Sequence, residues 1–297
     1  MSSDQPRSAA DVGLQRHAAR TSADQSLIRI DSIRQVFPGQ RPGETLIALD
    51  TIDMEIARGE MVAFIGPSGC GKSTLLNIIG GMIEPSAGAA HVAGASIRGP
   101  NPKRIAYIFQ ENALLPWSTV LDNVKVGLEF QGVPQSERHE RASSALAAVG
   151  LDRFAQSYPD QLSGGMKQRV ALARALSLET DILLMDEPFA ALDEQTRMVF
   201  GEELSRMLAE RGKTIILVTH SLAEAVFLSD RIFVFTARPG RIKSVLTVEE
   251  PHPRQPSFMT SDKFNGLRNT LYGLLRDEVL SAMGEDLAPG NTAGNGT

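Results

Sequence analysis

A glycine-rich segment at residues 66–74 constrains the fold of this 297-residue chain more than any other feature. It reads G-P-S-G-C-G-K-S-T and fits G-x-x-x-x-G-K-[ST], the pattern of a loop whose backbone amides bind phosphate. An apolar run, Met61–Ile65, precedes this phosphate loop, and an amphipathic run at residues 75–79 follows it. The motif requires a strand, this loop and a helix in that order, so the sequence predicts an α/β fold built around it.

Short apolar runs recur along the chain in the way expected for strands that are covered on both faces of a parallel sheet. They span residues 61–65, 105–109, 182–186, 214–219 and 231–235. Helical patterns lie between these runs, and this alternation predicts the core of a P-loop NTPase with a mainly parallel sheet. At 42% hydrophobic residues, the chain can close a core of that size.

Two further regions are expected around this core. Residues 27–57 alternate loosely between apolar and polar and are interrupted at 38–43 by prolines and glycines, which predicts an N-terminal antiparallel β subdomain. Helical patterns dominate residues 112–165 and predict an inserted α-helical subdomain. Its candidate helices span residues 120–130, 137–149 and 153–158.

The two ends of the chain lack these patterns. Residues 1–26 contain no apolar stretch of the kind found in secretory signals, and we expect a disordered tail there, followed by one domain over 27–247. Three prolines within residues 251–256 predict an extended linker. From about Asp262, a helix with an apolar stripe is expected, followed by a disordered tail from residue 289. The stripe consists of Phe264, Leu267, Leu271, Leu274, Leu275 and Val279.

Composition excludes several classes of protein. The net charge of −5, without a block of basic residues, argues against nucleic acid as the principal partner. The apolar runs are far shorter than the roughly 20 residues of a membrane span. The single cysteine, Cys70, excludes an internal disulfide framework. We interpret Cys70 as a small buried residue, although a redox-sensitive thiol is the alternative.

The phosphate loop predicts how a nucleotide is held. Its glycines let backbone N–H groups converge on phosphate, and the dipole of the following helix favours the anion. Lys72 can then bridge the β- and γ-phosphates, and the Ser73 hydroxyl can hold Mg²⁺. The expected nucleotide-binding residues are Gly66, Pro67, Ser68, Gly69, Cys70, Gly71, Lys72, Ser73 and Thr74.

Three more segments place polar side chains directly after buried strands. Asp186 and Glu187 end one run, and burying adjacent carboxylates is costly unless a cation offsets the charge, so we expect Asp186 to bind Mg²⁺ and Glu187 to deprotonate the attacking water. Gln110 can coordinate Mg²⁺ or water, and His220 can sense the γ-phosphate. Structural ion pairs, a solvated glutamine and a structural histidine are the alternatives.

A second anion site is predicted at residues 162–166, the segment L-S-G-G-M that precedes a helical pattern at 167–176. We name this segment the signature turn. A second anion site is redundant in a chain with one phosphate loop unless two copies meet head to tail. An ordinary glycine-rich helix cap is the alternative.

Together these segments resemble the ATP-binding subunits of ABC transporters, and the resemblance covers roughly residues 27–247. It implies ATP and Mg²⁺ as cofactors and a homodimer in which Ser163 and Gly165 of one subunit close on the γ-phosphate held by Lys72 of the other. It also places Phe37 where relatives stack an aromatic ring on adenine, although Phe37 could equally be a core residue of the sheet. The resemblance gives catalytic roles to Glu187, His220, Gln110 and Lys72.

Within that family, residues 114–124, 186–197 and 237–242 look like the nitrate, sulfonate and taurine importers. This likeness implies an ATP-hydrolysing motor at the cytoplasmic face of the inner membrane, docked on integral-membrane permease subunits and served indirectly by an extracytoplasmic solute-binding protein. Residues 112–117 would then receive a permease helix, with Trp117 as an exposed anchor or, alternatively, a core residue. The binding protein and permease choose the solute, so this sequence does not name it.

Two other functions remain open on the sequence. A non-transport ABC ATPase would act in mechanical signalling or on nucleic acid, and it would show a basic face. A P-loop kinase or GTPase is the third hypothesis, but it leaves the signature turn and His220 without a role.

Overall fold

The computed structural model describes residues 26–39 and 41–286. The predicted C-terminal tail from residue 289 lies outside this range. The predicted N-terminal tail does too, apart from Ser26, which begins the first strand.

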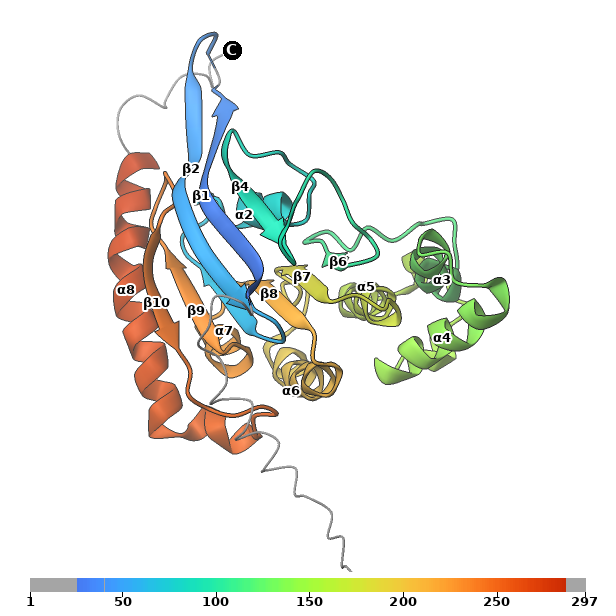
Figure 1. Ribbon diagram of the computed structural model, residues 1–297. Coiled ribbons are helices and arrows are strands. Elements are labelled where there is room, and N and C mark those ends of the chain that lie inside the picture. The colour runs from blue at the N-terminus through green and yellow to red at the C-terminus, as the bar shows by residue number, and fades with distance from the viewer. Residues whose placement is uncertain (1–25, 40, 287–297) are drawn as a thin grey trace, which may run out of the picture.

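A six-stranded sheet forms the centre of the molecule, in the order β10-β9-β3-β8-β7-β6 (Figure 1). Five strands run parallel and β10 is antiparallel to β9, so the prediction of a mainly parallel sheet is confirmed. All residues of β3, β7 and β8 are buried, as their apolar sequences predict. The strands are β3 (Met61–Ile65), β6 (Ile105–Ile108), β7 (Ile182–Asp186), β8 (Thr214–Val218), β9 (Arg231–Phe235) and β10 (Ile242–Thr247).

A second, antiparallel sheet of four strands has the order β2-β1-β4-β5. Its long hairpin, β1 (Ser26–Pro38) and β2 (Thr45–Ala57), turns at the predicted proline- and glycine-rich segment. The other two strands, β4 (Ala87–Val92) and β5 (Ala95–Ser96), were not predicted, because alanine and glycine carry little strand signal.

Helix α2 (Lys72–Ile79) joins the two sheets in one hydrophobic core. Because side chains alternate along a strand, Val62 and Phe64 of β3 belong to this core, whereas Ala63 and Ile65 belong to a second core shared with helices on the opposite face. Burial of Phe64 contributes about 2 kcal/mol to stability. The strand that leads into the phosphate loop is therefore fixed from both sides.

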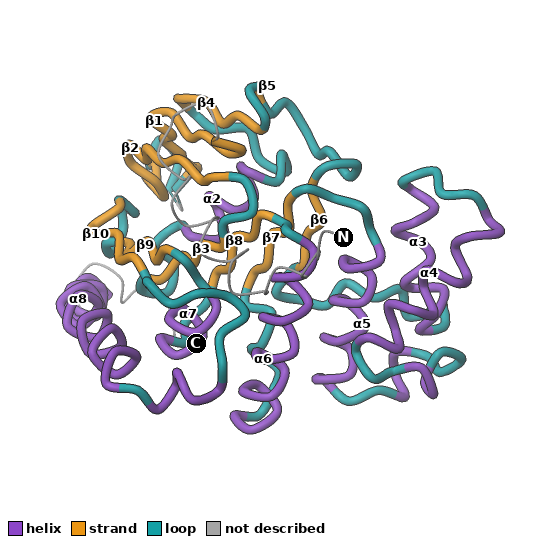
Figure 2. The backbone as a smooth tube through the Cα atoms, turned by 60° about the horizontal axis from the view of Figure 1, so that its bottom comes forward, coloured by secondary structure: helices purple, strands orange, loops and turns teal. Residues whose placement is uncertain are grey.

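Three helices pack on one another at one side of the molecule: α3 (Val120–Phe130), α4 (Gln135–Ala148) and α5 (Gly164–Ser177). In Figure 2, α3 and α4 stand outside α5, away from the sheets. The predicted helix at 153–158 is wrong. The chain instead forms two short 3₁₀ turns, Asp152–Phe154 and Pro159–Gln161, because the residue before a proline disfavours the helical conformation.

The remaining helices are α6 (Glu194–Arg211), α7 (Leu222–Leu228) and α8 (Asp262–Asp286). Helix α8, predicted from the apolar stripe, runs along the edge of the molecule opposite α3 and α4 (Figure 1). Phe264 and Leu271 are buried in the core, so the helix packs on its own chain. Within residues 26–39 and 41–286, the structure contains no helix with both the length and the apolarity to span a membrane.

In the predicted linker, residues 251–255 have no regular secondary structure and Pro256 begins a 3₁₀ helix, Pro256–Thr260, yet the segment is firmly anchored. Arg254 is buried and donates hydrogen bonds to backbone carbonyls, including those of Val226, Phe227 and Ser229 at 2.8–2.9 Å. Burial lowers the pKa of Arg254 to about 10. The segment thus attaches α8 to the core.

Candidate functional site

The predicted site residues gather at one edge of the central sheet. The phosphate loop follows β3, Asp186 ends β7, and Gln110 and His220 lie two residues beyond the ends of β6 and β8. These four parallel strands are neighbours in the order β3-β8-β7-β6, so their carboxyl ends meet. Ligands of open α/β sheets bind at this edge.

The conformation of the phosphate loop depends on its glycines. Gly69 and Gly71 have φ of 73° and 100°, in the left-handed region that favours glycine. A Cβ at Gly71 would also lie 2.6 Å from Leu49 Cδ2 and 2.8 Å from the carbonyl oxygen of Ala48. Gly71 is the N-cap of α2 and supplies no side chain to occupy the amides of the first turn. These amides can therefore donate to a phosphate.

Lys72, the first residue of α2, is buried beneath the loop. Its Nζ donates to the carbonyl oxygens of Gly66 at 2.9 Å and Pro67 at 2.8 Å, and lies 3.6 Å from Cys70 Sγ. Cys70 is buried, as expected, and burial raises the pKa of its thiol. The loop thus surrounds one cation, which is what an anionic ligand requires.

Ser73 and Asp186 form the contact expected of metal ligands. The Ser73 hydroxyl donates to Asp186 Oδ1 at 3.0 Å. The pKa of Asp186 is raised, mainly by burial and also by the charge of Glu187, although Ser73, Lys72 and His220 act in the opposite direction. Hydroxyl and carboxylate oxygens are ligands that Mg²⁺ accepts, and a cation would offset the cost of burying this carboxylate, so the residues fit Mg²⁺.

Glu187 has an unusual backbone for a residue other than glycine, with φ of 48°. This left-handed conformation costs about 1 kcal/mol. It is held by a hydrogen bond from the Glu187 amide to the carbonyl oxygen of Val218 in β8, at 2.9 Å. The fold therefore tolerates an unfavourable backbone conformation at the residue that the sequence predicts to be the general base.

The Glu187 carboxylate connects two other strand ends. Its Oε1 lies 2.7 Å from His220 Nε2, and its Oε2 accepts a hydrogen bond from Gln110 Nε2 at 3.3 Å. The Glu187 side chain is 18% exposed, so it can still reach a water molecule. Together with the contacts of Lys72 and the Ser73–Asp186 pair, this arrangement assembles the predicted catalytic and metal residues at one sheet edge.

Three predicted residues make their contacts elsewhere. Phe37 is half-buried at the end of β1, where it pairs with Leu46. Ser163 is the N-cap of α5 and accepts a hydrogen bond from the Met166 amide at 3.3 Å. A Cβ at Gly165 would lie 2.7 Å from Leu192 Cδ2. The roles predicted for Phe37, Ser163 and Gly165 therefore stay predictions.

Comparison with known proteins identifies the family. The profile of the ABC transporter family matches residues 49–190. An ABC transporter ATP-binding protein of Methanocaldococcus jannaschii, described as uncharacterized, is 44% identical over 256 residues, which cover 86% of this chain and 94% of the relative. The chain belongs to the ABC transporter ATP-binding family. As an ABC ATPase, it hydrolyses ATP.

Two relatives with more specific names and one solved structure narrow the likeness. A nitrate import ATP-binding protein of Synechocystis sp. is 45% identical, covering 75% of this chain and 83% of the relative. A taurine import ATP-binding protein of Chromobacterium violaceum is 46% identical, with 72% and 81% covered. An ATP-binding cassette solved as a dimer with ADP and Pi matches with a TM-score of 0.69 and 32% identity, covering 75% of this chain and 99% of that one. The predicted family and α/β fold are confirmed.

The sequence analysis did not predict a role for Glu224. In this ABC ATPase, Glu224 stabilises the turn that carries His220. The Glu224 carboxylate accepts a hydrogen bond from the Thr219 hydroxyl and lies 3.4 Å from Arg197 Nε. Burial is the main reason that the pKa of Glu224 is raised. The spacing Ser221-x-x-Glu224 is a helix-start pattern that could have drawn attention to it, and the Ser221 hydroxyl accepts from the Glu224 amide.

Arg238 was also missed. Its segment was recognised only for its likeness to relatives, yet the Arg238 guanidinium donates to the carbonyl oxygen of Gly69 in the phosphate loop. The two residues are 169 positions apart, so no local pattern connects them.

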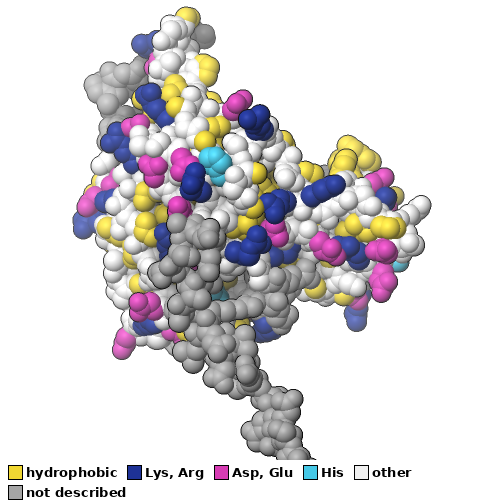
Figure 3. All heavy atoms as spheres, in the orientation of Figure 1, with side chains coloured by type: hydrophobic (Ala, Val, Ile, Leu, Met, Phe, Trp, Pro, Cys, Tyr) yellow, Lys and Arg dark blue, Asp and Glu magenta, His cyan; other side chains and the backbone are white. Residues whose placement is uncertain are grey.

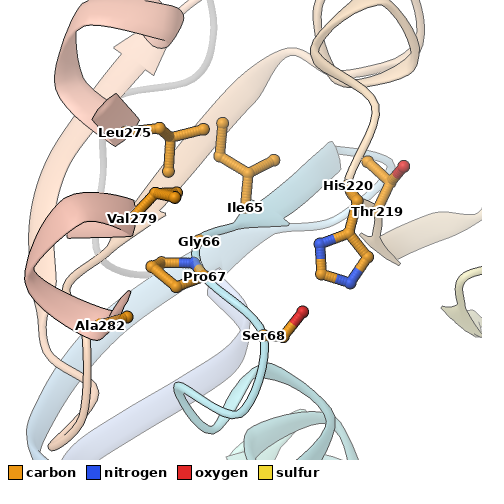
Figure 4. Close-up of a pocket in the computed structure, with 9 residues that line it drawn as sticks. All are labelled: Ile65, Gly66, Pro67, Ser68, Thr219, His220, Leu275, Val279 and Ala282. Carbon is orange, nitrogen blue, oxygen red and sulfur yellow. The ribbon is translucent and has the colours of Figure 1, made fainter. Parts of the chain in front are cut away.

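A cavity of about 330 Å³ adjoins the site between the phosphate loop and α8. In Figure 4, His220 and Ser68 lie on one side of it and three residues of α8 on the other. The loop and the histidine thus share an accessible space with the C-terminal helix.

Trp117 is exposed, so the alternative that it is a core residue is wrong. Its side chain is 74% exposed, and that of Phe130 is 76% exposed. Figure 3 shows hydrophobic side chains gathered on the surface beside α3. Trp117 is therefore available as an exposed anchor on the helical side of this ABC ATPase, and the permease contact stays a prediction.

Proposed function

We propose that this ABC ATPase is the motor subunit of an importer for nitrate, taurine, a sulfonate or a similar small solute. The observation that carries the proposal is the identity of about 45% to proteins named as nitrate and taurine import ATP-binding proteins. The site geometry supports it, because the residues needed for ATP hydrolysis lie together at one sheet edge.

In this proposal the phosphate loop and Lys72 hold the β- and γ-phosphates of ATP. The loop amides and the Lys72 ammonium surround the anion, with Lys72 exchanging carbonyl acceptors for phosphate oxygens. Ser73, Asp186 and Gln110 would hold Mg²⁺. The metal neutralises charge on the phosphate oxygens when bound.

Glu187 accepts the proton of the attacking water. His220 and Gln110 each contact one of its two carboxylate oxygens and so fix the direction in which it can accept a proton. His220 lies beside the cavity next to Ser68, where it can also contact the γ-phosphate. This arrangement makes the base dependent on residues from two other strand ends.

The complete machine is a homodimer. The signature turn presents an exposed Ser163 and a partly buried Gly165 at the start of α5, and a second anion site is redundant within a subunit that has one phosphate loop. Ser163 and Gly165 of one subunit would close on the γ-phosphate held by Lys72 of the other, so ATP joins the subunits and hydrolysis releases them. The dimeric state of the related cassette supports this arrangement. Phe37 would stack on adenine.

The helical side docks on the permease. Trp117 and its neighbours at residues 112–117 offer an exposed aromatic contact for a permease helix at the cytoplasmic face of the membrane. Solute arrives through an extracytoplasmic binding protein, and that protein and the permease select it.

Turnover and assembly of the Glu187→Gln variant test this proposal. We expect ATP hydrolysis to fall at least about 100-fold, because the base is removed, while ATP binding is kept and ATP with Mg²⁺ produces a stable dimer. The measurement is phosphate release together with sizing chromatography, with Glu140→Gln, on the exposed face of α4, as the matched control. A Glu187→Gln protein that hydrolyses ATP at the wild-type rate would exclude Glu187 as the base.

Copurification of integral-membrane permease subunits with the tagged chain tests the importer itself. We expect Trp117→Ala to weaken that complex and leave the ATPase rate of the isolated chain unchanged. A complex of the same strength with Trp117→Ala would place the contact elsewhere.

A further inference from the structure

Arg238 contacts the phosphate loop from outside the loop motif. Its Nε and Nη2 both donate to the carbonyl oxygen of Gly69, at 3.1 and 3.0 Å. The backbone of the same segment lies against the loop, since a Cβ at Gly240 would stand 1.9 Å from the carbonyl oxygen of Cys70. Only glycine at position 240 permits this approach.

The contact fixes the orientation of one peptide unit. In a trans peptide, the carbonyl of Gly69 and the amide of Cys70 point in opposite directions, so Arg238 draws the oxygen outward and directs the Cys70 N–H inward. That N–H donates a long hydrogen bond, with an N···O distance of 3.4 Å, to the carbonyl oxygen of Pro67, the same atom that accepts from Lys72 Nζ at 2.8 Å. The Cys70 amide is therefore directed to the side of the loop where the Lys72 ammonium lies.

This peptide needs an anchor because it follows a glycine. Gly69 has φ of 73°, and glycine can leave this region at little cost, so the peptide after it can rotate. Rotation would point a carbonyl oxygen, rather than an amide, at the phosphate. A double hydrogen bond from a guanidinium opposes that rotation.

Helix α8 holds the residue that precedes Arg238. Glu278 accepts a hydrogen bond from the Ala237 amide at 2.8 Å and pairs with Lys243 Nζ at 2.8 Å. Lys243 in turn donates to the carbonyl oxygen of Leu274, one helical turn before Glu278. The C-terminal helix is therefore joined to Ala237, in the segment that carries Arg238, and to Lys243, which directly follows that segment.

Helix α8 also faces the loop directly. Leu275, Val279 and Ala282 line the cavity opposite Gly66, Pro67 and Ser68 (Figure 4). These residues lie on the turns of α8 that flank Glu278. One face of α8 thus lies beside the phosphate loop, and the same helix carries Glu278, which holds Ala237, the neighbour of Arg238.

We propose that Arg238 is a positioning residue for ATP, which holds the Gly69–Cys70 peptide in its phosphate-binding orientation, and that Glu278 of α8 fixes Arg238 in place. The inference rests on the proposed role of the phosphate loop. It assigns a function in ATP binding to the C-terminal helix and to the segment at residues 237–242.

The test measures ATP affinity and the kinetic constants separately. We expect Arg238→Ala to raise the Kd for a non-hydrolysable ATP analogue and the KM for ATP about three- to ten-fold, because the Gly69–Cys70 peptide of the variant can rotate before ATP binds. The kcat should change less than about two-fold, because the catalytic residues are unchanged. Arg238→Lys keeps one donor and restores part of the affinity. Glu278→Gln raises Kd about two-fold, since its amide oxygen still accepts from Ala237.

Two exposed residues of α8 provide matched controls, Arg276→Ala for the arginine and Asp277→Asn for the glutamate, and both should bind the analogue like the wild type. Thermal unfolding without nucleotide separates positioning from stability. An Arg238→Ala variant with wild-type Kd and KM overturns the inference, and so does one that loses affinity only in proportion to lost folded protein. Lys72→Ala distinguishes the two assumptions: if it weakens binding and Arg238→Ala does not, the inference alone fails, and if neither does, the proposed role of the loop fails.

Discussion

The molecule has two glycine-rich helix starts, and they differ in how much of the fold holds them. The phosphate loop is held by two cores, by the Ser73–Asp186 contact and by Arg238, with Lys72 buried beneath it. The signature turn is held less extensively: Leu162 is buried in the core and Gly165 lies close to Leu192, but Ser163 and Gly164 are exposed, and Ser163 accepts a hydrogen bond from the Met166 amide. The preformed phosphate loop can therefore bind phosphate alone, whereas the role proposed for the signature turn depends on a phosphate held by a partner subunit.

The largest effect is expected from Lys72→Ala, which alters the phosphate loop, the more firmly held of the two helix starts. We expect turnover to fall at least about 100-fold and ATP affinity to fall with it, because the only cation beneath the loop among the residues the structure describes is removed. Lys103→Ala, at an exposed position, is the matched control. Phosphate release and analogue binding measure the effect, and undiminished ATP affinity would contradict the role given to Lys72.

A pair of glycine substitutions tests the difference in backbone constraint. Gly71→Ala should lower the free energy of unfolding by about 3 kcal/mol, because φ is 100° and the new Cβ meets Leu49 at 2.6 Å. Gly164→Ala should change it by less than about 0.5 kcal/mol, since the nearest atom to its Cβ is 3.7 Å away. Urea unfolding of the two variants measures this contrast. Equal losses would mean that both turns are held to the same degree.

Ser163→Ala tests the signature turn rather than the phosphate loop. An isolated subunit should bind ATP with unchanged affinity, whereas turnover should fall about ten-fold, because the hydroxyl is lost only from the closed dimer. Thr196→Ala, where a hydroxyl bonds to Asp193 at the start of α6, is the control for the loss of a hydroxyl near a helix start. Weaker ATP binding by monomeric Ser163→Ala would show that the serine contacts ATP within its own subunit.

Site residues that follow apolar strand runs could be predicted from the sequence. The phosphate loop, Asp186, Glu187 and His220 each follow an apolar strand run, and the order of parallel strands then brings them together. Strands β4 and β5 went unpredicted because their short, alanine-rich sequences gain stability from neighbouring strands rather than from their own residues. The prediction of a helix at 153–158 was wrong because it did not take account of the effect of Pro159 on the residue before it.

Contacts between distant segments could not be predicted in the same way. Arg238 reaches Gly69 because β9 pairs with β3, and Glu278 reaches Ala237 because α8 packs beside β9. Within their own segments, Arg238 and Glu278 look like any charged surface residues, so the sequence does not predict their contacts. Positioning residues of this kind follow from the topology of the sheet.

The smallest expected effect concerns the charge of Glu278. Burial raises its pKa, but the hydrogen bonds from Lys243 and Ala237 outweigh burial, so the pKa lies below its usual value. A carboxyl group with a lowered pKa stabilises the fold above its unfolded pKa, and this stabilisation is lost as the pH falls through its folded pKa. Wild type should therefore exceed Glu278→Gln by about 0.5 kcal/mol in free energy of unfolding at neutral pH. The difference should close in acid, below the usual range of a glutamate, as measured by urea unfolding across pH, with Asp277→Asn as the control. A difference that persists in acid would show that packing, rather than charge, joins α8 to the segment beside the phosphate loop.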